Sequence, residues 1–153
     1  MPLEIERKFL VTSDSYRDNA YASEINQAYL SIKDKMAIRV RIDGIHASLA
    51  IKSKISERVN KEYEYTIPID EARSLMNLDD LFVIRKTRYL VEYEGHTWEV
   101  DEFHDDNKGL VVAEIELDNE NETFSNPPWL GKEVTADYRY LNSNLAITSF
   151  RKW

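Results

Sequence analysis

Apolar and polar residues alternate with a period of two along most of this chain, which is the pattern of half-buried β-strands. Asp43-Gly44 and Glu94-Gly95 stand between consecutive alternating runs and predict hairpin turns. The pattern predicts eight strands, at residues 3–11, 24–32, 37–43, 47–54, 59–68, 82–93, 97–103 and 110–118. The chain is therefore expected to be mainly β, of the α+β class.

Helical signals are short and few. They predict helices at residues 13–19, 70–77 and 143–150, with Asp70 and Ser143 as the N-caps of the last two. No linker, internal repeat or shift in composition divides the sequence, so residues 1–153 are predicted to form one domain.

One face of almost every predicted strand is ionised. Seven of the eight strands repeat a charged-x-charged unit, and each unit lies on one face because successive strand side chains point to opposite sides. The units are Glu4/Glu6/Lys8, Arg39/Arg41, Lys52/Lys54, Glu62/Glu64, Lys86/Arg88, Glu99/Asp101 and Glu114/Glu116. A solvated sheet face explains any single strand, but ordinary solvent faces also use serine, threonine and glutamine. The whole set instead favours a closed sheet whose charges face a polar lumen.

A lumen with so many charges needs ligands of opposite sign, because unpaired charges are costly to desolvate. Carboxylates favour a hard divalent cation such as Mg²⁺ or Mn²⁺. Lysine and arginine side chains favour a polyanion such as phosphate. A metal-bound polyphosphate satisfies both halves of the predicted lumen.

Composition excludes several other classes of protein. The chain has 153 residues, no cysteine and a formal charge of −8. The absence of cysteine excludes disulfides and thiolate zinc sites, and the negative charge argues against a nucleic-acid partner. The sequence contains no apolar run of the roughly 20 residues that span a bilayer, and its acidic start is unlike a signal peptide. We therefore expect a cytoplasmic protein that does not bind membranes.

The order of these charged units resembles a known family. Glu4-Ile5-Glu6-Arg7-Lys8 is similar to the ExExK signature that opens the CYTH family, also called the triphosphate tunnel metalloenzymes. The resemblance continues through Ile38–Arg41, Ile51-Lys52, Glu62–Glu64, Arg85–Tyr89, Glu99–Asp101, Ala113–Glu116, Trp129–Thr135 and Tyr138–Tyr140. It is strongest to the small bacterial members. It implies a closed eight-stranded antiparallel β-barrel that forms a charged tunnel, with a few short helices outside.

The resemblance also implies roles for individual residues. The metal would be held by Glu4, Glu6, Glu114 and Glu116, assisted by Asp101 and by Glu62 or Glu64. The phosphates would be held by Lys8, Arg39, Arg41, Lys52, Lys86 and Arg88, with Arg139 as a looser contact. The cofactor would be Mg²⁺ or Mn²⁺, with two ions when substrate is bound. Tyr29 is expected to pack, Lys54 to lie beyond the lumen, and Glu99 is left outside the site.

The implied reaction is attack of water on a terminal phosphorus of a triphosphate, with tripolyphosphate as the leading substrate and nucleoside triphosphates as a further possibility. Glu4, Glu6 and Glu64 are alternatives for the proton acceptor, and Lys8 is counted with them as a catalytic residue. Three other readings stay open: a class IV adenylate cyclase, a thiamine triphosphatase, and a binding module for polyphosphate or nucleotides without turnover. A homodimer is also open.

Overall fold

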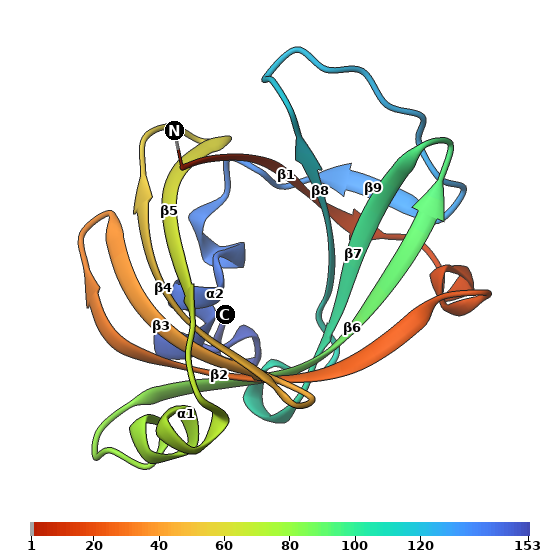
Figure 1. Ribbon diagram of the computed structural model, residues 1–153. Coiled ribbons are helices and arrows are strands. Elements are labelled where there is room, and N and C mark those ends of the chain that lie inside the picture. Colours follow the sequence, from red (N-terminus) through yellow and green to blue (C-terminus); the bar gives the residue numbers. More distant parts are fainter. Residues whose placement is uncertain (1) are drawn as a thin grey trace.

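The computed structural model describes residues 2–153, and a closed ring of antiparallel strands dominates it (Figure 1). The strand order is β5-β4-β3-β2-β6-β7-β8-β1, and pairing of β5 with β1 closes the ring. The eight strands are β1 (Leu3–Val11), β2 (Tyr21–Lys33), β3 (Met36–Asp43), β4 (His46–Lys54), β5 (Val59–Thr66), β6 (Phe82–Tyr93), β7 (His96–Phe103) and β8 (Val111–Leu117). The predicted eight-stranded barrel is thus confirmed.

A ninth strand, β9 (Leu130–Glu133), was not predicted. It shares one edge of β1 with β5. Residues Leu3–Ile5 of β1 pair with β5, and Phe9 and Val11 pair with β9. A Cβ atom on Gly131 would lie 2.9 Å from the carbonyl oxygen of Leu10, so the close approach of β9 to β1 requires glycine there.

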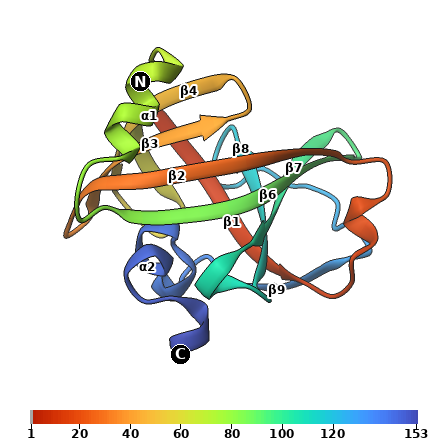
Figure 2. The same ribbon diagram turned by 90° about the horizontal axis from the view of Figure 1, so that it is seen from below.

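The two α-helices take different positions. Helix α1 (Ile69–Met76) packs outside the barrel over β3 and β4, whereas α2 (Asn142–Ile147) lies against β6 and β2 at one end of the ring (Figures 1 and 2). The predicted N-caps of these helices are wrong, because the N-caps are Pro68 and Leu141.

The remaining short segments are 3₁₀ turns. The predicted helix at residues 13–19 is only one such turn, and residues 143–150 end in another. The turns are η1 (Ser15–Arg17), η2 (Asp105–Asn107), η3 (Tyr138–Tyr140) and η4 (Phe150–Lys152). Among residues 2–153, the structure contains no helix with both the length and the apolar character to cross a membrane.

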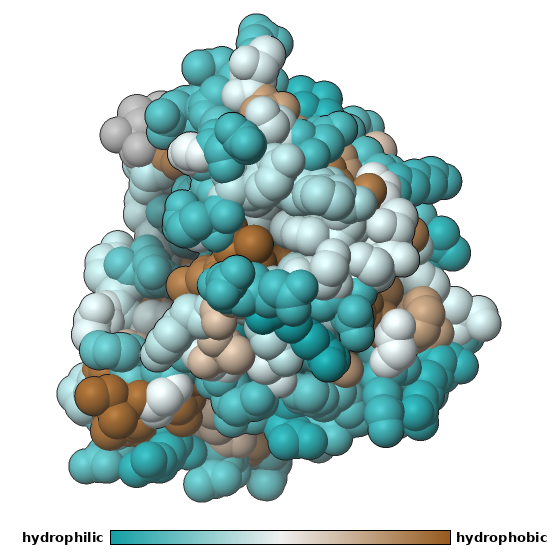
Figure 3. All heavy atoms as spheres, turned by 90° about the vertical axis from the view of Figure 1, so that its right-hand side faces the viewer, coloured by the Kyte–Doolittle hydropathy of each residue, from teal (hydrophilic) through white to brown (hydrophobic). Residues whose placement is uncertain are grey.

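Apolar residues gather mainly on the outer faces of the strands. One cluster surrounds Trp98 and Trp129 beside β1, β7 and β8, and another surrounds Val40 beneath α1. A third cluster closes one end of the barrel: Ile84 and Val112 share strand faces with Lys86 and Glu114, and they pack with Leu145 of α2. The face seen in Figure 3 is largely hydrophilic, with apolar groups separated from one another. The lumen between these clusters is left to polar side chains.

Candidate active site

The barrel surrounds a cavity that is partly open to solvent. Its walls come from β1 to β6, from β8 and from the start of α2. Of the residues predicted from the sequence, the cavity is lined by Glu6, Lys8, Arg39, Arg41, Lys52, Lys86, Arg88 and Glu114. Side chains of both signs from strands far apart in the sequence therefore face one space.

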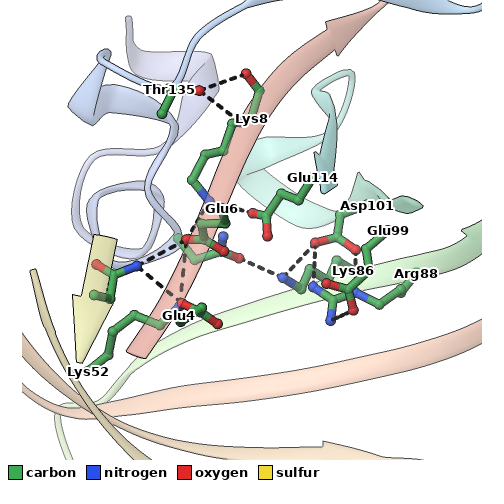
Figure 4. A network of polar contacts seen from close by, with 12 residues as sticks. Glu4, Glu6, Lys8, Lys52, Lys86, Arg88, Glu99, Asp101, Glu114 and Thr135 are labelled. Atoms are coloured by element: carbon green, nitrogen blue, oxygen red, sulfur yellow. Dashed lines mark hydrogen bonds and ion pairs between the residues drawn. The ribbon is translucent and has the colours of Figure 1, made fainter. Parts of the chain in front are cut away.

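A buried network on β6 and β7 forms one side of the site. Asp101 is 1% exposed, and its two oxygens accept from Lys86 Nζ at 2.8 Å and from Arg88 Nε at 2.8 Å. Arg88 Nη1 also donates to Glu99 at 2.8 Å. Burial raises the pKa of Asp101, but Arg88 and Lys86 outweigh it and hold the pKa at about 2. Asp101 therefore orients two cations and has both of its oxygens engaged (Figure 4).

Lys86 itself is poorly compensated. Burial lowers the pKa of this lysine to about 7, and the nearby guanidinium groups of Arg88 and Arg41 add to the shift against the opposing effect of Asp101. Its ammonium also donates to the side-chain oxygen of Asn142 on α2, at 2.8 Å. An anion in the cavity would favour the charged form of Lys86.

A second network joins β1 to β4, β5 and β8. Lys52 Nζ lies 2.8 Å from Glu4, 3.5 Å from Glu62 and 3.8 Å from Glu6. Lys8 Nζ lies 2.5 Å from Glu114 and 3.6 Å from Glu6. Burial raises the pKa of Glu6, but Lys52 and Lys8 outweigh it and lower the pKa to about 2. Glu6 is therefore ionised at neutral pH and held by two lysines.

Glu116 extends the acidic side of the site. It is exposed and lies directly opposite Glu6 in the pairing of β1 with β8. Burial of part of the side chain, followed by the charges of Glu4 and Glu99, raises its pKa to about 7. An acidic group of this kind is the donor set that hard divalent cations prefer. Within residues 2–153, however, the acidic and histidine side chains do not converge in threes to form a ready metal site.

The arginines of β3 complete the basic side. Arg39 Nη2 lies 3.3 Å from Glu64, while its buried Nε has no hydrogen-bond partner among residues 2–153. Arg41 Nε donates to the side-chain oxygen of the fully buried Gln27 at 3.0 Å. Both arginines line the cavity, so their guanidinium groups are available to an anion in it.

Several neutral residues belong to the site and were missed or set aside. Tyr29, expected to pack, lines the cavity and accepts from Gln27 at 3.1 Å. Asn60 lines it too and donates to Glu4 at 3.1 Å. Asn142, the first residue of α2, also lines the cavity. Alternation shows that Gln27 and Tyr29 share a face, but no charge on β2 indicates that this face is the lumen.

Two other residues differ from their expected surroundings. Glu99, left outside the site, lies within it through its contact with Arg88. Arg139 is not brought to the cavity: its guanidinium pairs with Asp137 at 2.7 Å and lies 4.8 Å above the ring of Trp153. Lys54 lies beyond this cavity as expected: it lines a neighbouring hollow, and its Nζ donates to the carbonyl of Glu57.

Comparison with known proteins places this geometry in a family. The CYTH domain matches residues 2–147. A protein of Acetivibrio thermocellus named inorganic triphosphatase is 43% identical over 100% of this chain and 99% of its own length. A protein of Nitrosomonas europaea with the same name is 33% identical over 95% and 97% of the two chains. A crystal structure of an inorganic triphosphatase has a TM-score of 0.67 at 33% identity and covers 94% of each chain.

The match spans nearly the whole barrel, and it includes every strand that contributes a charge to the cavity. CYTH triphosphatases in general depend on a metal ion, which agrees with the oxygen donors described above. The chain belongs to the CYTH family.

Proposed function

We propose that this protein is a metal-dependent triphosphatase that hydrolyses inorganic tripolyphosphate in the lumen of its barrel. The observation that carries the proposal is one cavity lined by Arg39, Arg41, Lys86 and Arg88 and also by Glu6 and Glu114. The relatives named inorganic triphosphatase support the same conclusion. A cation and a polyanion each find side chains of opposite charge in this space.

In this proposal the basic side of the site holds the phosphates. Arg39 and Arg41 present guanidinium forks from β3, and Lys86 and Arg88 approach from β6, where Asp101 orients them. These fixed positive charges stabilise the negative charge that spreads over the transferring oxygens. Asp101 therefore acts by orienting Lys86 and Arg88 and not as a metal ligand.

The acidic side of the site would hold Mg²⁺ or Mn²⁺, as two ions with substrate bound. Glu4, Glu6, Glu114 and Glu116 are the proposed ligands, with Glu62 close by. When bound, the metal neutralises phosphate charge and orients the attacking water. The pKa of about 2 makes Glu6 a weak base for the proton of water. Glu4 and Glu64 are the other candidates.

The substrate assignment predicts a specific product pattern. With Mg²⁺ or Mn²⁺, tripolyphosphate should yield equal amounts of orthophosphate and pyrophosphate, because water attacks a terminal phosphorus. Excess EDTA should abolish the reaction. Ion chromatography of the products checks both expectations. Cyclic AMP and pyrophosphate from ATP would instead support the cyclase, and tripolyphosphate binding without any turnover would support a binding module.

The pKa of Lys86 predicts a dependence of binding on pH. At pH 8 most Lys86 side chains are neutral in the free protein, because burial lowers the pKa to about 7. Bound tripolyphosphate favours the charged form, so binding in EDTA should take up roughly one more proton than binding to Lys86→Met. The affinity of the natural protein should therefore fall as pH rises through 7.

Calorimetry at pH 8 in two buffers of different ionisation enthalpy measures this uptake. The Lys86→Met variant cancels any proton exchange by tripolyphosphate itself, which is the same for both proteins. At pH 6 the extra uptake should be small, because the free lysine already carries its proton. Equal uptake by the two proteins at pH 8 would contradict the assignment.

A further inference from the structure

The two lysines on the acidic side occupy different surroundings. Lys8 is enclosed, with only 6% of its side chain exposed, and it lies between Glu6 and Glu114. Lys52 leaves 30% of its side chain exposed and faces the cavity. Its ammonium nevertheless lies within 4 Å of three carboxylates from two strands, at 2.8, 3.5 and 3.8 Å. Figure 4 shows the side chains of Lys52, Glu4 and Glu6 next to one another.

The ammonium of Lys52 thus stands where a bound cation would compete with it. The carboxylates of Glu4, Glu6 and Glu62, called here the acidic group, surround the positive charge of Lys52. A divalent ion that takes oxygens from Glu4 and Glu6 would meet this charge at short range, where like charges repel most strongly. Either the ion binds weakly, or the ammonium of Lys52 moves away from these carboxylates.

The side chain of Lys52 can reach a second position, in the cavity. It lines the same cavity as Arg39, Lys8 and Lys86, and its four-carbon stem allows the ammonium to turn from the carboxylates toward that space. A polyanion in the cavity would favour this position. Lys8 lacks this freedom, since its side chain is buried and its ammonium is enclosed by Glu114 and Glu6.

We propose that Lys52 is a tethered counter-ion that holds the acidic group together without metal and moves to the phosphates when a divalent cation binds. The inference rests on the proposed function, because it assumes that this acidic group is the metal site. Metal binding then frees a cation for tripolyphosphate, and tripolyphosphate binding removes a competitor for the metal. Metal and substrate therefore bind with positive coupling, each raising the affinity for the other by the same factor, on the order of 5- to 100-fold.

Replacement of Lys52 by methionine should shift the two affinities in opposite directions. Without substrate, Lys52→Met should bind Mn²⁺ roughly 5- to 10-fold more tightly than the natural protein, because the competing cation is gone. In EDTA, the same variant should bind tripolyphosphate roughly 10-fold more weakly, because Glu4, Glu6 and Glu62 lose the cation that offsets their repulsion of the polyanion. Calorimetry with Mn²⁺ alone and with tripolyphosphate alone measures these affinities.

Lys54→Met is the matched control. Lys54 lies on the same strand, two residues away, so its replacement removes the same charge. Its ammonium, however, donates to the carbonyl of Glu57 and does not contact the acidic group. Any gain in Mn²⁺ affinity from the change in overall charge should appear in both variants. Only the gain specific to Lys52 reports displacement.

Thermal unfolding supplies an independent measurement that also checks folding. Lys52→Met leaves three carboxylates without their shared cation, so its melting temperature should be lower without metal. Saturating Mn²⁺ should raise that temperature more in Lys52→Met than in the natural protein or in Lys54→Met, because tighter binding stabilises more. Lys52→Gln, which keeps a hydrogen-bond donor, should show the same order with a smaller initial loss.

Mn²⁺ affinity in Lys52→Met equal to or below that in Lys54→Met would overturn the inference. If the natural protein still released orthophosphate from tripolyphosphate, the proposed function would survive that result. If Lys52→Met bound Mn²⁺ more tightly but no protein in the series hydrolysed tripolyphosphate, the displacement would stand and the proposed function would fail.

Discussion

Replacement of Glu6 by glutamine is expected to lower kcat/KM for tripolyphosphate by about 10²- to 10³-fold, since in the proposed mechanism Glu6 is a metal ligand whose loss removes several kcal/mol of transition-state stabilisation. Glu6 is 7% exposed, lines the cavity and lies between Lys8 and Lys52. Glutamine keeps the size of the side chain and its contact with Asn60, but it loses the charge. Steady-state kinetics with Mg²⁺ and with Mn²⁺ measures the effect.

Glu102→Gln is the control for this variant. This variant makes the same chemical change as Glu6→Gln, but on β7 and outside the lumen. There Glu102 accepts hydrogen bonds from Tyr16 and Arg17. It should lower stability slightly and leave kcat/KM within about twofold, since surface pairs contribute little. If the two variants lost activity equally, the loss would reflect the fold and not the site, and the assignment of Glu6 would be wrong.

Replacement of Asp101 by asparagine should have the largest effect on stability. Asp101 is fully buried beneath Lys86 and Arg88, so its neutral replacement leaves Lys86 without a carboxylate partner and Arg88 with Glu99 alone. Breaking a buried pair in this way costs about 3–5 kcal/mol of the free energy of unfolding. For a chain of this length the melting temperature should fall by roughly 10 °C. Urea denaturation at pH 7 gives the free energy directly.

The acid limb of the stability curve provides a second test of Asp101. Its pKa is about 2 in the folded protein and is 3.8 as a free side chain. Its contribution is therefore fully present above pH 3.8 and is lost as pH falls toward 2. The stability difference between the natural protein and Asp101→Asn should shrink over that window. Asp105→Asn breaks an exposed pair with Arg85 and should cost at most about 1 kcal/mol. A similar loss in both variants would contradict the role of the buried network.

The strands and the charged character of the lumen could be predicted, because both depend on the alternation of apolar and polar residues. On β3, for example, Arg39 and Arg41 must share a face with each other and not with Val40, whatever the rest of the chain does. The same logic fails for β9, since four residues that include Gly131 carry no periodic signal. It also fails at Asp70, which lies in the first turn of α1 and therefore resembled a cap.

The pairing of charges could not be predicted, because it depends on register between distant strands. Nothing local to Lys8 indicates that Glu114 lies opposite it, yet that pairing places the two side chains in contact. Asn142 was missed for a related reason: it reaches Lys86 only because α2 lies across one end of the barrel. Neutral amides carry no signal in a pattern built on charge, so Gln27 and Asn60 were missed as well.

The divided edge of β1 has a consequence for the order of folding. The other barrel strands join through hairpins or neighbouring segments, but β1 contacts only β5, β8 and β9, all distant in sequence. Such non-local pairings form late, because they close long loops. We therefore expect β1 to join the barrel late. Since β1 carries Glu4, Glu6 and Lys8, the proposed site should form only when the barrel closes, and partly folded chains should be inert toward triphosphates.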